Sequence, residues 1–132
     1  MARAPEPRLV YLDTHIACWL YEGRIDLISE PAATAIEGGR LRVSPIVDLE
    51  LQYLYEIGRL TKGPADILPV LARELGLEVG TEPFARVVLE ARKLGWTRDP
   101  FDRLIVAETV LTEALLVSKD SLIREHCAAV VW

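Results

Sequence analysis

The chain has 132 residues, 51% of them hydrophobic, which is enough for one domain with a single apolar core and argues against a disordered chain. Fifteen lysines and arginines stand against twenty acidic residues, which gives a formal net charge of −5. On its face this charge disfavours a nucleic-acid binder, because phosphate contacts need basic groups. We expect one domain over residues 1–132, with an extended lead over residues 1–7.

The sequence favours a protein of the reducing cytoplasm. No apolar run reaches the ~18 residues that a membrane helix requires. The first eight residues lack the apolar stretch of a signal peptide. Cys18 and Cys127 have no Cys-x-x-Cys spacing, so we expect neither a zinc site nor a disulfide, and both thiols are predicted to fill core space.

Short apolar runs alternate with helical patterns from residue 9 onward. Glycines mark most of the expected helix ends, and prolines mark several helix starts. In the first half of the chain we expect strands at residues 9–12 and 41–44, and helices at residues 15–21, 30–37 and 46–57.

The second half continues the alternation. We expect helices at residues 64–75, 83–94, 99–113 and 120–126, and strands at residues 77–79, 115–118 and 129–131. Alternating strands and helices form parallel βαβ units with helices on both faces of the sheet. The predicted fold class is therefore α/β, a three-layer α/β/α sandwich with a short, mainly parallel central sheet. In such folds, ligands bind beside the carboxyl ends of the strands.

Four acidic residues occupy positions that a purely structural carboxylate rarely takes. Asp13 directly follows the first strand, and Asp120 comes shortly after the strand at residues 115–118. Glu50 and Asp102 lie on helical stripes of apolar residues, where an unpaired carboxylate is costly. These four acids are our candidate catalytic and metal-binding residues.

Structural roles compete with this hypothesis. Asp13, Asp99 and Asp120 each precede a helix, where aspartate is a preferred N-cap. Asp102 can make a capping-box-like contact. Glu50 has no capping role, and its structural alternative is a buried ion pair with a Lys or Arg.

Together the acids indicate a cation. Carboxylates held close together repel one another, and some must protonate unless a positive charge joins them. Mg²⁺ and Mn²⁺ take oxygen ligands, and Mg²⁺ keeps several waters, so a few carboxylates suffice. Such sites carry out phosphoryl-transfer or phosphodiester chemistry.

Four segments make the prediction more specific. They are LDTH at residues 12–15, SPIVDLEL at 44–51 followed by GRL at 58–60, RDPFDRLIVA at 98–107, and LVSKD at 116–120, where Ser118 replaces the usual threonine. In this order and spacing, the segments resemble PIN-domain proteins, and the third resembles their VapC-type toxin branch. Trp132 also fits that branch.

The resemblance implies a Mg²⁺- or Mn²⁺-dependent ribonuclease that dimerises, cuts RNA and is paired with a small antitoxin protein. Carried over residue by residue, its acidic cluster is Asp13, Glu50, Asp102 and Asp120. Thr14, Asp99 and Ser118 are expected to orient ligands or waters from behind the carboxylates. Arg98 and Arg103 are candidate RNA contacts, or they pair with the acids.

Other residues have structural roles as the first expectation. His15 is expected at a helix start, and His126 near the end of the last helix. Trp19, Trp96 and Trp132 are expected in the core or an interface, with Trp96 the best of the three for stacking on RNA.

Two rival functions remain open at this point. One is a catalytically silent module of the same fold that binds RNA or a protein, and the other is a phosphotransfer domain with Asp13 as acceptor, which leaves Glu50 unexplained. Removing the four site acids from the formal charge of −5 leaves −1. The acidity therefore reflects a predicted metal site and says little against RNA.

Overall fold

The computed structural model describes residues 6–132. Residues 1–5 of the predicted extended lead lie outside this range, and Glu6 and Pro7 have no regular secondary structure. Five parallel strands form one sheet in the order β3-β2-β1-β4-β5. They are β1 (Leu9–Leu12), β2 (Arg40–Val43), β3 (Glu78–Val79), β4 (Leu115–Val117) and β5 (Val130–Val131).

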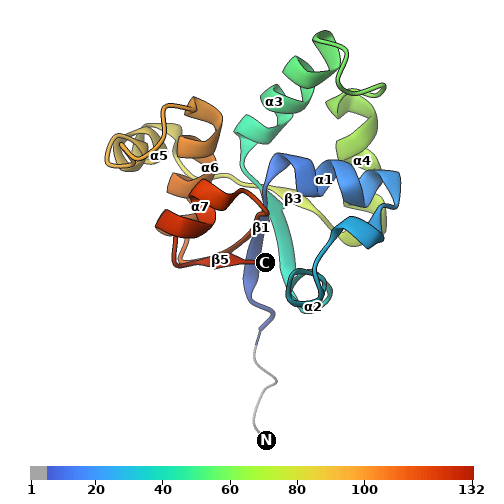
Figure 1. The fold of residues 1–132 in the computed structure, drawn as a ribbon, viewed down its shortest axis with the longest axis horizontal. Coiled ribbons are helices and arrows are strands. Elements are labelled where there is room, and N and C mark those ends of the chain that lie inside the picture. Colours follow the sequence, from blue (N-terminus) through green and yellow to red (C-terminus); the bar gives the residue numbers. More distant parts are fainter. Residues whose placement is uncertain (1–5) are drawn as a thin grey trace, which may run out of the picture.

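Seven α-helices and one short 3-10 helix connect the strands of residues 6–132. They are α1 (Thr14–Glu22), η1 (Ile25–Leu27), α2 (Glu30–Gly38), α3 (Pro45–Glu56), α4 (Pro64–Leu75), α5 (Phe84–Ala91), α6 (Pro100–Leu111) and α7 (Ser121–His126). Figure 1 shows α5 and α6 on one side of the strands and α1 and α4 on the other, with α3 above the carboxyl end of β2. The predicted three-layer α/β/α architecture is confirmed.

Local chemistry explains where the helices begin. Ser29 and Ser44 cap α2 and α3, since their hydroxyl oxygens accept hydrogen bonds from Ala32 N and Ile46 N, each at 3.3 Å. A proline in the first turn of each of these helices needs no donor there.

Helices α5 and α6 end two or more residues earlier than their patterns predicted. Helix α5 stops at Ala91 rather than residue 94, because the following backbone tightens into three-residue hydrogen bonds such as Leu94 N to Ala91 O, at 3.1 Å. Helix α6 stops at Leu111 because Glu113 adopts a left-handed backbone, with φ of 55°. The 3-10 helix η1 was not predicted, since three residues carry no periodic signal.

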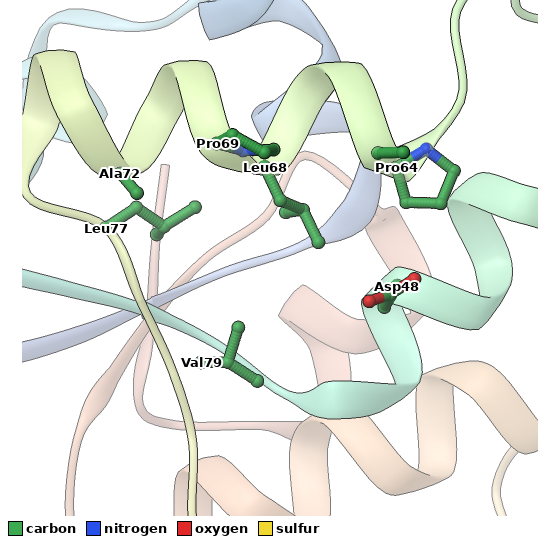
Figure 2. Close-up of a pocket in the computed structure, with 8 residues that line it drawn as sticks. Asp48, Pro64, Leu68, Pro69, Ala72, Leu77 and Val79 are labelled. Carbon is green, nitrogen blue, oxygen red and sulfur yellow. The ribbon is translucent and has the colours of Figure 1, made fainter.

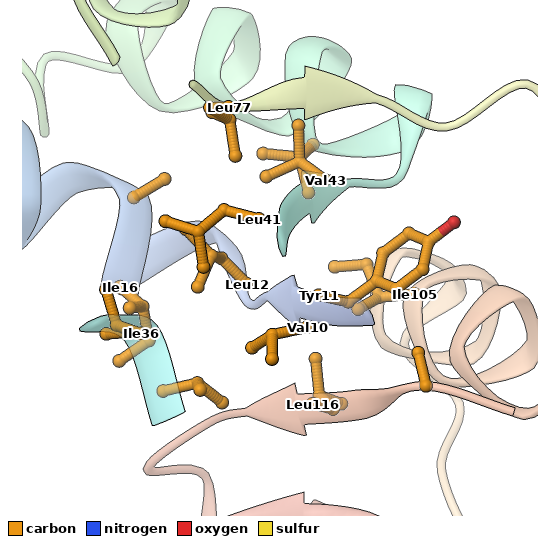
Figure 3. Packing of buried hydrophobic residues seen from close by; sticks show 14 of the residues in the cluster. Val10, Tyr11, Leu12, Ile16, Ile36, Leu41, Val43, Leu77, Ile105 and Leu116 are labelled. Atoms are coloured by element: carbon orange, nitrogen blue, oxygen red, sulfur yellow. The ribbon is translucent and has the colours of Figure 1, made fainter. Parts of the chain in front are cut away.

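The core lies between the sheet and both helical layers. Alternate residues of β1 point to opposite faces, as a strand requires. Figure 3 shows Tyr11 pointing toward Ile105 of α6, while Ile16 of α1 and Ile36 of α2 lie on the other side of the strand. Cys18 and Cys127 are buried free thiols, as expected.

The helices of residues 6–132 are too short or too polar to cross a bilayer.

Gly39, between α2 and β2, is a test of how tightly the layers pack. A Cβ there would lie 2.5 Å from Val10 Cγ2 and 2.7 Å from the Ala35 carbonyl oxygen. We expect Gly39→Ala to lower the free energy of unfolding by about 1–3 kcal/mol, measured by urea denaturation. Gly38→Ala is the matched control, because nothing lies within 4 Å of its Cβ position. Equal stability of the two variants would contradict this close approach of α2 to β1.

Candidate active site

The acids converge at the carboxyl edge of the sheet. Strands β1 and β4 are neighbours, and the Asp13 N–H after β1 donates to the Val117 carbonyl oxygen at the end of β4, at 3.0 Å. The four predicted site acids line one hollow of about 220 Å³, together with Asp99, Thr14, His15 and Leu54. The sequence-based prediction that they meet at one end of the sheet agrees with this geometry.

Asp13 is the best-anchored of the four acids. Its side chain is buried and accepts hydrogen bonds from Thr14 N at 2.8 Å and from the Ser118 hydroxyl at 2.6 Å. The Ser118 hydroxyl oxygen in turn accepts from Asp120 N at 3.1 Å. Ser118 therefore ties the loop after β4 to the carboxylate after β1, and both Ser118 and Thr14 donate hydrogen bonds to Asp13.

Glu50 reaches the hollow from α3. Its carboxylate accepts a hydrogen bond from the Thr14 hydroxyl. Partial burial raises the pKa of Glu50, the Thr14 hydrogen bond opposes this, and the negative charges of Asp13 and Asp99 raise it further. Within residues 6–132 no Lys or Arg forms an ion pair with Glu50, so the buried ion pair considered above is not formed.

Asp102, in the first turn of α6, has the least favourable environment. Burial raises the pKa of its carboxyl to about 7, and nearby carboxylates add to the effect, Asp13 most and then Asp99, Asp120 and Glu50. In the described part of the chain no protein group donates a hydrogen bond to this carboxylate. The ionised form of Asp102 therefore lacks compensation from the protein.

Three of the acids that line the hollow also cap helices. Asp13 caps α1, Asp99 caps α6 by accepting from Phe101 N at 2.8 Å, and Asp120 caps α7 by accepting from Ile123 N at 3.0 Å. The capping-box-like contact considered for Asp102 is not formed.

The donor set fits a hard divalent cation, because apart from the His15 ring the polar groups that line the hollow are carboxylate and hydroxyl oxygens. Across residues 6–132 no three acidic, histidine or cysteine side chains are already close enough to surround an ion directly. Mg²⁺ commonly keeps several of its waters, and water-mediated contacts allow a wider spacing of the acids.

Arg98 and Arg103, which adjoin Asp99 and Asp102 in sequence, line a separate hollow between α5 and α6. Arg92, Val88 and Leu104 also line this hollow. Arg98 Nη1 donates to the Gly95 carbonyl at 3.0 Å, and Arg103 Nε donates to the Ala91 carbonyl at 3.1 Å. Among the described residues neither arginine forms an ion pair, so the pairing with the acids considered above is absent.

Trp96, the tryptophan favoured above for RNA, stacks face to face on His126, with ring centroids 5.0 Å apart. Both rings line a hollow that also includes Arg8, Cys127 and Ala129, near the amino ends of β1 and β5. Trp96 is therefore not part of the acid hollow.

Sequence reasoning missed a buried carboxylate on α6. Glu108 is 2% exposed and lies near Tyr11 and Arg42, and burial raises its pKa. A Cβ at Gly80 would overlap Glu108 Oε2, so a larger residue there would force the Glu108 carboxylate to move. The signal was available, because Glu108 follows Ile105 at helical spacing just as Glu50 follows Val47.

A larger hollow, of about 460 Å³, lies away from the acids between α3, α4 and β3. Figure 2 shows Leu68 and Pro69 of α4 above Val79, with Asp48 of α3 beside them. Asp48 is the one charged residue among its lining residues, so the hollow lacks the groups that the predicted chemistry needs.

Comparison with known proteins agrees with this fold. The sequence model of the PIN domain matches residues 10–128. The chain belongs to the PIN-domain family. It is similar to Ribonuclease VapC22 of Mycobacterium tuberculosis (strain ATCC 25618 / H37Rv), with 32% identity over 123 residues that cover 89% of this chain and 91% of the relative. The resemblance to the VapC-type branch is confirmed.

Solved structures share the fold. A toxin–antitoxin complex from Klebsiella pneumoniae matches with a TM-score of 0.64 and 15% identity over 93% of this chain and 96% of the matched chain. VapBC2 from Rickettsia felis, bound to a DNA fragment from their promoter, matches with a TM-score of 0.59 and 17% identity over 92% and 96%. VapBC-1 from nontypeable Haemophilus influenzae matches with a TM-score of 0.57 and 18% identity over 89% of this chain and 93% of the matched chain.

The raised pKa of Asp102 predicts how stability depends on pH. In EDTA, the folded state holds a proton on Asp102 up to about pH 7, whereas the unfolded chain loses it near the ordinary value of 3.8. The folded state thus binds more protons between these values, so this group makes stability fall as pH rises through that window. We expect Asp102→Asn to raise Tm at pH 8 in EDTA, with a smaller gain toward pH 4.

The control for this experiment is Asp66→Asn, which removes an exposed acid from the first turn of α4. The plot of Tm against pH for this variant should remain parallel to that of the wild type across pH 4–8. A lower Tm for Asp102→Asn at pH 8 would contradict the conclusion that the ionised Asp102 carboxylate destabilises the metal-free fold.

Proposed function

We propose that this protein is a Mg²⁺- or Mn²⁺-dependent endoribonuclease, and that it is the toxin of a toxin–antitoxin pair. The observation that carries the proposal is the Asp102 carboxylate, which lies among other acids and whose negative charge no group of residues 6–132 compensates. A divalent cation supplies the missing positive charge. The VapC22 relative and the PIN-domain match support RNA as the substrate.

The residues have distinct roles in this proposal. Asp13, Glu50, Asp102 and Asp120 hold the cation, which when bound polarises a phosphate and lowers the pKa of water. Ser118 and the Thr14 N–H each donate to one Asp13 oxygen, so they fix the direction in which that carboxylate points. The Thr14 hydroxyl does the same for Glu50.

The surrounding chain positions the substrate. Acids alone repel RNA, so the cation makes RNA binding at the hollow possible. Arg98 precedes α6 and Arg103 lies in its first turn, and the guanidinium N–H groups that do not bond to the backbone can contact phosphates that flank the cut. Asp99 holds the first turn of α6 and thereby the position of Asp102.

The proposal includes protein partners and a compartment. The three structural relatives named above are toxin–antitoxin or VapBC assemblies, which supports a small antitoxin protein as partner. Four apolar side chains of α3 and its C-cap are 47–58% exposed and support a homodimer contact: Leu49, Tyr53, Tyr55 and Ile57. Two buried free cysteines support a cytoplasmic location.

Removing a site carboxylate tests the reaction. We expect Asp13→Asn and Asp102→Asn each to slow cleavage of an RNA pool by more than roughly 100-fold, because loss of a ligand outweighs loss of a group behind it. EDTA should abolish cleavage and added Mn²⁺ should restore it. The measurement is gel analysis of the products with mapping of the new ends.

Asp66→Asn is the control, since it removes an acid of α4 that does not line the hollow. Full activity of both site variants together with indifference to EDTA would contradict the proposal. A folded wild type that binds RNA or a protein without cutting would favour the silent binding module. Absence of any rise in Tm with Mn²⁺ would also favour that alternative.

Arginine contacts with phosphate predict a salt dependence. Arg98→Gln should weaken binding of different RNA sequences to a similar extent and lower the slope of log affinity against log salt by about 1. Cleavage rates at RNA concentrations far below saturation, measured across a series of salt concentrations, give this slope. Arg73→Gln is the control, because the Arg73 side chain is exposed on α4 away from the acids, and it should leave the slope unchanged. If Arg98→Gln and Arg73→Gln gave the same salt slope, Arg98 would not contact an RNA phosphate.

A further inference from the structure

Three aromatic rings and a lysine gather on one side of the acid hollow. We call them the aromatic–lysine cluster: His15 and Trp19 of α1, Lys119 after β4, and Trp132 after β5. The His15 ring stands edge-on to Trp19 with centroids 5.1 Å apart, and the Trp19 and Trp132 centroids are 6.3 Å apart. Lys119 Nζ lies 5.9 Å from the Trp19 centroid.

The cluster is continuous with the acid hollow. His15 lines the hollow, and its Nδ1 lies 3.7 Å from Asp13 Oδ2. Trp19 is therefore one ring away from the acids. Lys119 directly precedes Asp120, so the loop that supplies a site carboxylate also supplies the ammonium group. Because β1 and β4 are paired, these two loops stay side by side.

The chemistry of the cluster complements a nucleotide. Trp19 offers a partly buried ring that Trp132 supports from one side, and a supported ring is a platform for a nucleobase. Lys119 is exposed and, among residues 6–132, forms no ion pair although Asp120 is its neighbour. A phosphate can therefore reach its ammonium group.

We propose that the aromatic–lysine cluster binds one nucleotide of single-stranded RNA next to the phosphate that is cut. The base stacks on Trp19, and Lys119 moves from the ring to the phosphate of that nucleotide. This inference rests on the proposed ribonuclease function and adds to it a subsite that prefers an unpaired base. Stacking accepts any base, so the subsite selects single strands rather than a sequence.

The subsite also defines a path for the RNA. Arg98 and Arg103 lie on the α5–α6 side of the acids, whereas Trp19 and Lys119 lie on the α1 side. Figure 1 shows these helices on opposite sides of β1. An RNA strand that contacts both groups crosses the carboxyl edge of the sheet, where the acids lie.

The test removes the base and the ring separately. A short RNA that contains a mapped cut site is made as a series, each member with one abasic ribose near the cut. For the wild type, one position should slow single-turnover cleavage about 10- to 100-fold. Trp19→Leu should lose a similar factor on intact RNA and lose nothing more at that position, because the stacking partner is already absent.

Three further variants make the result specific. Trp19→Phe keeps a ring and should restore most of the rate. Trp96→Leu removes a tryptophan that stacks on His126 instead, and it should show the abasic profile of the wild type. Lys119→Gln should lower the slope of log cleavage rate against log salt by about 1, which corresponds to the loss of one phosphate contact.

The outcomes separate the two proposals. A wild type that cuts RNA with no sensitive abasic position overturns the subsite and leaves the ribonuclease function intact, even if Trp19→Leu does not fold. A folded Trp19→Leu with the wild-type profile also overturns it and assigns the cluster to packing or to a protein partner. A wild type that never cuts RNA overturns the ribonuclease proposal and the subsite with it.

Discussion

Repulsion among carboxylates is the constraint around which this structure is organised. Folding brings four site acids and Asp99 to one small hollow, and the pKa of Asp102 near 7 reflects the energy that this arrangement costs. The rest of the domain supplies that energy through its buried core. A fold that keeps such a hollow is one in which a bound positive charge compensates for the repulsion.

The parallel sheet converts sequence order into site geometry. Because β1 and β4 are central neighbours, the residues that follow them meet, although Asp13 and Ser118 are 105 positions apart. Hydrogen bonds through Ser118 and Thr14 then hold the carboxylates in fixed directions. The same two loops carry His15 and Lys119, so the acids and the proposed nucleotide subsite share one support.

Much of this arrangement could be predicted from sequence, and the remainder depends on packing between distant segments. Strand ends located Asp13 and Asp120, and apolar helical stripes located Glu50 and Asp102, because these are local signals. The directions of the Arg98 and Arg103 side chains depend on carbonyls of a preceding turn. The stack of Trp96 on His126 joins segments 30 residues apart and leaves no local pattern.

The double use of aspartates, as helix caps and as proposed site residues, has an evolutionary consequence. A descendant that lost catalysis would still gain stability from Asp13, Asp99 and Asp120, so selection for folding alone would retain them. Glu50 and Asp102 cap no helix and are costly when ionised without a cation. Among related chains these two positions should therefore distinguish working nucleases from inactive ones, whereas the three capping aspartates should persist in both.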